Sequence, residues 1–191
     1  SIGRADTTFV QRNGSMEEND LKDITFKLDN EFKISQNNHL DFGIQTIWNK
    51  IDYQFTQNDT TSIIDRNDEG LTSTFYVQDK HTFWKKLILK AGLRASHYSL
   101  TNEFYVEPRA ALTFLLSDKL KLKAAWGKYH QFANRIVRED IQQGSRDFWL
   151  LADGEKVPVS SSIHHIAGIS YETSKWLFDV EAYYKTLDGL S

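Results

Sequence analysis

Hydrophobic and polar residues alternate along most of this chain. In the clearest run, Ile24, Phe26, Leu28, Phe32 and Ile34 occupy alternate positions, and most of the residues between them are charged. An extended strand places such residues on one face, whereas a helix would distribute them around its surface. The pattern therefore predicts a β-strand with one apolar face and one polar face.

The same period of two recurs over most of the sequence. The predicted strands cover residues 23–34, 40–55, 71–79, 87–95, 106–116, 120–128, 163–171 and 176–184. A weaker alternation at residues 7–11 predicts a further strand, and no segment has the 3.6-residue period of an amphipathic helix. The expected fold class is all-β, with eight or nine strands.

The predicted connections alternate between two lengths. Short turns are expected at residues 35–39, 82–86, 117–119 and 173–175. Longer, polar connections are expected at residues 13–20, 56–70, 96–105 and 131–162. This alternation is typical of an up-and-down antiparallel sheet with one plain rim and one elaborate rim, whereas a Greek-key sandwich mixes the two kinds of connection.

Strand length and aromatic placement point to a membrane. A strand of about eleven residues, tilted by about 45°, spans about 25 Å, the height of the apolar band of an outer-membrane barrel. Aromatic residues gather where the stripes end. Those near the short turns are Phe83, Trp84, Tyr171 and Trp176, and those toward the long connections are Trp48, Tyr53, Phe55, Tyr98, Phe104, Tyr105, Tyr129 and Phe132. Two aromatic belts predict the wall of a transmembrane β-barrel, with its apolar face in lipid and its polar face toward a watery lumen.

Two other architectures share part of this pattern. A soluble antiparallel sheet also alternates, with its apolar face turned to a protein core, so a carbohydrate-binding β-sandwich is one alternative. A small self-contained outer-membrane barrel is another, because eight strands suffice to close one.

Composition narrows the function classes. The chain has 191 residues, a net charge of −3, 13% aromatic residues and no cysteine. The slight acidic excess gives no basic surface for nucleic acid. The absence of cysteine excludes disulfide scaffolds and thiolate metal sites.

Three stretches of the sequence resemble the barrel of TonB-dependent outer-membrane receptors, especially the Bacteroidetes-type branch. They are "EPRAALTFLLSDKLKLKAAWGKYHQF" at residues 107–132, "GSRDFWLLADGEKVPVSSSIHHIAGISYE" at residues 144–172 and "FDVEAYYKTLDGL" at residues 178–190. The resemblance implies a barrel of about 22 strands closed by an N-terminal plug. Residues 1–191 are then expected to form a central part of that barrel domain, without the plug and the C-terminal strands.

The resemblance also implies a function and partners. Such receptors take up a scarce ligand, of siderophore, vitamin or glycan type, across the outer membrane of a Gram-negative bacterium with energy delivered by TonB. The expected partners are the TonB system acting through the plug, the cargo, outer-membrane lipid and a surface lipoprotein. No nucleic acid, no cofactor and no enzymatic activity are expected.

The connection at residues 131–162 holds the candidate ligand-binding residues, because loops on a rigid scaffold carry recognition. They are Arg138, Glu139, Asp140, Arg146 and Trp149. The two arginines are suited to clamping an acidic ligand, and the tryptophan to stacking on a ring or sugar. The structural alternative is that this stretch only packs the connection against its neighbours.

Histidines suggest two further sites. His97 and Ser99 have the His-x-Ser spacing of an outer-membrane hydrolase, which would also need an orienting asparagine and an oxyanion site. His164 and His165 are adjacent on a predicted strand, so they point to opposite faces and cannot bind one metal ion together. No metal site is predicted.

Overall fold

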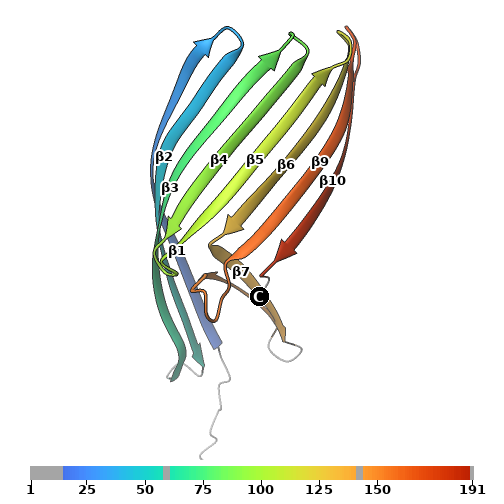
Figure 1. Cartoon of the computed structure of the whole chain (residues 1–191). Helices are drawn as coiled ribbons and strands as arrows, with labels where there is room; N and C mark the ends of the chain where they lie inside the picture. The colour runs from blue at the N-terminus through green and yellow to red at the C-terminus, as the bar shows by residue number, and fades with distance from the viewer. Residues whose placement is uncertain (1–14, 58–60, 141–143, 190–191) are drawn as a thin grey trace, which may run out of the picture.

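The computed structural model describes residues 15–57, 61–140 and 144–189, and every regular element in them is a β-strand (Figure 1). The strands are β1 (Ser15–Ser35), β2 (Asn38–Gln57), β3 (Thr61–Phe83), β4 (Leu87–Tyr98), β5 (Glu103–Leu115), β6 (Leu120–Gln131), β7 (Ala133–Asp140), β8 (Gly144–Leu151), β9 (Ser160–Glu172) and β10 (Leu177–Asp188). Among these residues no helix is long and apolar enough to cross a membrane. The all-β prediction is confirmed.

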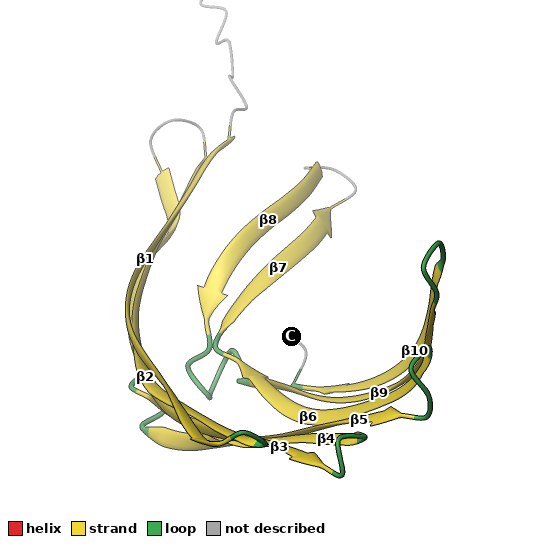
Figure 2. Cartoon of the chain, turned by 90° about the horizontal axis from the view of Figure 1, so that it is seen from above, coloured by secondary structure: helices red, strands yellow, loops and turns green. Residues whose placement is uncertain are grey.

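Eight of the strands form one antiparallel sheet, which we call the wall. Its order is β1-β2-β3-β4-β5-β6-β9-β10, so each strand pairs with the next along the chain except where β7 and β8 form a separate hairpin. Seen from above, the wall curves, and the β7–β8 hairpin lies on its concave side (Figure 2). The two edges, β1 and β10, do not pair with each other in the described sheet. The self-contained barrel is therefore wrong for this chain, because the sheet is open.

The register keeps each kind of side chain on one face of the wall. In one row Leu112 pairs with Ala124, which pairs with Ala167, and in the next row Thr113 pairs with Lys123. The hairpin packs on Tyr98, so the residues that share a face with Tyr98 are concave, and the pairings place Thr113 among them. The convex face is apolar and uncovered in the described residues. A soluble sandwich is therefore not supported, since its apolar face would be covered by a second sheet.

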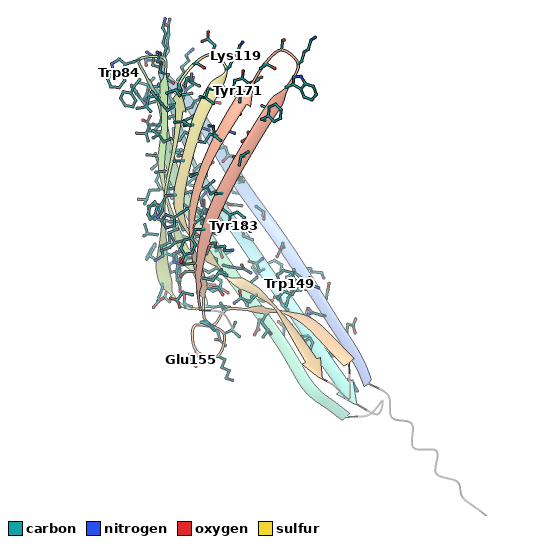
Figure 3. All side chains as sticks on the ribbon, turned by 90° about the vertical axis from the view of Figure 1, so that its right-hand side faces the viewer. Trp84, Lys119, Trp149, Glu155, Tyr171 and Tyr183 are labelled. Atoms are coloured by element: carbon teal, nitrogen blue, oxygen red, sulfur yellow. The ribbon has the colours of Figure 1, made fainter. Side chains whose placement is uncertain are left out.

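The two ends of the wall differ. The turn end carries the connections 36–37, 84–86, 116–119 and 173–176, and the hairpin end carries the connection 99–102 and the β7–β8 hairpin. Trp84, Lys119 and Tyr171 lie at the turn end, and Glu155 lies at the opposite end (Figure 3). The aromatic residues predicted near the short turns therefore gather at one end.

The end of the wall opposite the short turns differs from the prediction. Most of the predicted connections 13–20 and 56–70 are strand, because residues 15–20 and 61–70 extend β1 and β3 beside β2. Residues 7–11, the predicted weak strand, lie outside the described residues. The predicted loop 96–105 shrinks to four residues, 99–102. Strands β1 to β3 contain 21, 20 and 23 residues, whereas β4 to β6 contain 12 or 13. These extensions lack alternation because their backbone ladder, rather than an apolar face, holds them in the sheet.

Candidate ligand-binding site at the hairpin end

The predicted ligand-binding residues all lie on the β7–β8 hairpin, not on an irregular loop. In its register Arg138 is opposite Arg146, Glu139 is opposite Ser145 and Asp140 is opposite Gly144. Trp149 is half-buried and pairs with Arg135. The side chains of Arg138, Glu139, Asp140 and Arg146 lie outside the described part of the structure, so their contact with ligand stays a prediction.

A buried apolar cluster fixes the base of this hairpin to the wall. Tyr98, Leu151 and Ala152 are 0% exposed, and Leu150 and Val157 are also buried. The backbone N–H of Ala152 donates to the carbonyl of Phe132 at 2.8 Å, which closes the base of the hairpin. The hairpin is therefore held by a packed core, although most of the wall's apolar residues are exposed.

The sheet leaves room for this cluster at a glycine. A Cβ atom on Gly70 would lie 3.2 Å from Leu151 Cδ1 and 3.2 Å from the ring of Tyr98. Strand β8 also contacts β1 and β2, and Ile51 and Tyr53 of β2 are buried. Because only a small residue leaves this space open, the sequence of β3 positions the hairpin over the concave face.

A tight loop follows β8. The carboxylate of Asp153 accepts three hydrogen bonds, from the backbone N–H groups of Glu155, Lys156 and Val157, at 3.1, 2.8 and 2.8 Å. Gly154 has a φ of 78°, a left-handed conformation that glycine adopts without steric cost. The connection to β9 is therefore ordered by its own hydrogen bonds, next to the base of the hairpin.

Several aromatic residues of the predicted belt toward the long connections instead pack against one another at the base of the hairpin. The rings of Tyr98 and Phe132 lie 4.6 Å apart, and those of Tyr105 and Phe132 lie 5.1 Å apart. These three residues contact one another on the concave side, so their assignment to lipid is wrong. Phe104, in contrast, faces outward and is 75% exposed. The positions of aromatic residues in the sequence do not distinguish those on the concave face from those on the convex face, because the face of each residue depends on the strand register.

A cleft of about 220 Å³ lies beside the hairpin on the concave face. Among the residues whose side chains the structure describes, those that line it are polar or cationic at most positions and include no carboxylate. They are Tyr129, His130, Gln131, Asn134, Arg135, Ser160, Ser161, Ser162, Lys185 and Leu187. Cationic and hydroxyl groups without a carboxylate suit an anionic, oxygen-rich ligand group.

Tyr129 is oriented by its neighbours in this cleft. The guanidinium of Arg109 lies 5.0 Å from the centre of its ring, and the ring of His164 lies 4.8 Å away. The hydroxyl of Ser162 is hydrogen-bonded to His164 at 3.1 Å. Tyr129, Ser162 and Lys185 were not among the site residues predicted from the sequence. The available signal was their place on the polar face near the hairpin ends of their strands.

A buried carboxylate anchors the strand below the cleft. Glu107 is 5% exposed, and its side chain accepts hydrogen bonds from Arg109 at 2.9 Å and from the backbone N–H of His130 at 2.6 Å. Arg94 approaches the same carboxylate at 3.7 Å. Burial of a carboxylate is costly unless it is paired, and these partners supply the pairing. Glu107 thereby links β4, β5 and β6 on the concave face.

A second and larger hollow of about 820 Å³ lies further along the concave face. Its charged lining residues carry both signs, among them Lys27, Asp29, Glu31, Asp41 and Lys90. Mixed charge on this face agrees with a water-filled interior behind the apolar convex face.

The two histidine-containing sites considered from the sequence can be compared with the structure. His97 is hydrogen-bonded to Asn102 at 3.2 Å, but the hydroxyl of Ser99 accepts a hydrogen bond from the backbone N–H of Leu71 at 2.8 Å. That serine is held by backbone rather than activated by the imidazole, so the geometry does not support the hydrolase. On β9, His164 lies toward the cleft and His165 lies near Tyr184. Within the described residues no group of three acidic, histidine or cysteine side chains is arranged to hold a metal ion.

Together the fold and the site define a class: the wall of a large up-and-down β-barrel with a polar cleft under an inserted hairpin. The family model described as TonB dependent receptor-like, beta-barrel matches residues 2–190. The chain therefore belongs to this family, a family of receptors rather than enzymes. A search of curated protein sequences gave no match.

Solved receptors share the fold. The siderophore receptor PirA from Pseudomonas aeruginosa superposes with a TM-score of 0.64 at 14% identity, over 88% of this chain and 32% of that one. The alcaligin outer-membrane receptor FauA from Bordetella pertussis gives 0.62 at 16% identity, over 93% and 31%. The ferric yersiniabactin uptake receptor FyuA from Yersinia pestis gives 0.62 at 13% identity, over 91% and 29%. The chain thus spans about a third of the length of these receptors.

Proposed function

We propose that this chain is part of the barrel of a receptor in the outer membrane of a Gram-negative bacterium, which takes up a scarce ligand with energy delivered by TonB. Family membership carries the proposal, and the uncovered apolar convex face supports a place in lipid. Residues 1–191 form a partial barrel domain. The plug that contacts TonB comes from another segment of the same protein, and a surface lipoprotein is a further expected partner.

The hairpin end is where the cargo is captured. Arg138 and Arg146 are opposite each other in the register of β7 and β8, and like charges in such a pair destabilise a hairpin unless a counter-charge is near. The residues that line the adjoining cleft include Lys185 and Arg135. These groups favour an anionic ligand. Among the three cargo types, a ferric siderophore complex carries such charge. PirA is described as a siderophore receptor, and FyuA is described as a ferric yersiniabactin uptake receptor.

Uptake of iron tests the proposal. Cells that lack their other iron receptors and express the full-length receptor are given ⁵⁵Fe bound to siderophores from an iron-starved culture of the source bacterium. We expect uptake that disappears when tonB is deleted. The double variant Arg138→Gln and Arg146→Gln should lower uptake about tenfold or more, since each charge-assisted hydrogen bond contributes about 1.5–3 kcal/mol.

The matched control is Lys156→Gln, which removes an exposed cation from the loop after β8. It should leave uptake unchanged. Uptake that persists without TonB would refute the transport mechanism, and equal uptake by the arginine variant and the control would refute the capture site.

A further inference from the structure

The turn end of the wall is one continuous rim. The backbone N–H of Leu115 donates to the carbonyl of Lys86 at 2.7 Å, and that of Glu172 donates to the carbonyl of Lys119 at 2.8 Å. Each turn is thereby tied to the neighbouring strand pair. Successive turns are two strands apart, which corresponds to about 10 Å. Their side chains therefore form a single row at a fixed spacing.

Lysines occupy three of the four turns in this row. They are Lys85, Lys86, Lys119 and Lys175, all exposed. In the part of the chain that the structure describes, none of the four forms an ion pair. Of the nearby carboxylates, Asp118 lies in the row, and Glu172 is paired with Lys121 at 2.9 Å. Four lysines beside the single carboxylate of Asp118 give the described rim a net positive charge.

Two tryptophans stand among these lysines without protein cover. Trp84 is 83% exposed and Trp176 is 66% exposed, next to Phe178 at a ring distance of 6.3 Å. Tryptophan is the residue that proteins place at the boundary between hydrocarbon and headgroups.

The first turn has an unusual backbone. Residues 83–86 form a β-turn closed by a hydrogen bond from Lys86 N–H to the Phe83 carbonyl at 3.0 Å, with φ of 48° at Trp84 and 59° at Lys85. Asparagine and glycine are the residues that such a turn favours. A tryptophan and a lysine here cost conformational energy. The Trp84 ring lies 5.9 Å from that of Phe83, but the side chain is 83% exposed, so packing offsets little of this cost.

We propose that the turn-end rim binds the headgroups of anionic phospholipid. The lysine ammonium groups bind the phosphates, and the indoles lie at the level of the glycerol backbone. The β1–β2 turn, Gln36 and Asn37, carries no cation, so the lipid preference belongs to the section from β3 to β10. The inference rests on the proposed membrane location but not on the cargo.

Lipid retention measures this preference. The full-length receptor is placed in nanodiscs of phosphatidylethanolamine and phosphatidylglycerol, released from them, and the retained lipids are counted by native mass spectrometry. The unmodified receptor should retain phosphatidylglycerol in excess over its share of the bilayer. The triple variant Lys85→Gln, Lys119→Gln and Lys175→Gln should lose the preference by more than fivefold, because each surface lysine contributes about fivefold to binding an anionic leaflet.

The matched control removes three lysines from other parts of the chain, Lys22→Gln, Lys128→Gln and Lys156→Gln, and should keep the preference. A triple variant that retains as much phosphatidylglycerol as the parent overturns the proposal, as does an equal loss in the control. If the triple variant does not fold, the three single variants are measured instead, and full retention by all three overturns it. A receptor that fails to insert even into neutral bilayers refutes the membrane location, a result distinct from insertion without lipid preference.

Discussion

At the hairpin end, Leu151 and Tyr98 are completely buried between the β7–β8 hairpin and the sheet, whereas along the wall Phe26 and Val180 are 62% and 65% exposed. Both regions consist of antiparallel strands. They differ in how their apolar side chains are covered. The hairpin end forms a small packed core, as a protein does in water, whereas the wall leaves its apolar face open, which under the proposed function is to hydrocarbon. Exposure of large apolar side chains would therefore destabilise the hairpin end, whereas the convex face of a membrane-embedded wall requires it.

Truncation in the packed region should have the largest effect. Leu151→Ala removes a side chain that fills the space beside Gly70, and such a change costs about 2–5 kcal/mol in a core that cannot collapse. We expect the hairpin to detach locally. Hydrogen exchange at the Ala152 amide should quicken accordingly, while Leu100→Ala, in an exposed turn at the same end, should leave it unchanged. Unaltered exchange in Leu151→Ala would mean that the hairpin does not depend on this core.

A charge on the convex face should have the next largest effect. Ala110 and Ala111 are adjacent near the middle of β5 but lie on opposite faces of the wall. Ala110→Arg should lower the free energy of unfolding in vesicles by about 2–4 kcal/mol, the cost of arginine on a lipid face near mid-membrane. Ala111→Arg should be mild because it faces water. A similar loss in both variants would remove the distinction between the two faces.

The buried carboxylate on the concave face gives a smaller effect. Glu107→Gln keeps the shape of the side chain but removes the counter-charge of Arg109 and Arg94. The loss should be about 1.5–3 kcal/mol, the range for hydrogen bonds to charged groups. Denaturant titration of the full-length receptor measures it. No change in the titration midpoint would show that water in the lumen replaces the pairing.

The smallest effect is expected at an exposed ion pair of the wall. Lys123 and Asp179 lie 2.7 Å apart, with both side chains about a third exposed. Asp179→Asn should leave the unfolding midpoint within experimental error, because exposed pairs contribute little. A clear loss at this position would indicate that the lumen face is drier than its charge pattern suggests.

The sequence predicted the wall well because its physical signal is local. The alternation at residues 120–128 and 163–171 foretold strands β6 and β9, since each apolar residue must face the same solvent as its neighbours. The hairpin was predicted only as a loop. Its strands are eight residues long and carry charged residues such as Arg138 and Asp147, so they lack a continuous apolar stripe. Their position depends on a core formed with Tyr98 and Gly70, which are distant in sequence.

The candidate site was predicted in part for the same reason. The hairpin residues stood out as a charged, aromatic-containing insertion. The cleft beside it joins Tyr129 on β6 with Ser162 and Lys185 on β9 and β10, and only the strand register brings them together. Backbone hydrogen bonds set that register, and the composition of a single segment does not predict it.

The central claim is that the convex face of the wall contacts hydrocarbon and the concave face contacts water. Nitroxide labels placed one at a time at residues 106–113 of the full-length receptor in bilayers test it most directly, through their accessibility to oxygen and to a water-soluble nickel complex. We expect even positions, including Ala110 and Leu112, to favour oxygen, and odd positions, including Ala111 and Thr113, to favour nickel or to be shielded from both. Equal accessibility at neighbouring positions, or nickel access at the even ones, would contradict the account.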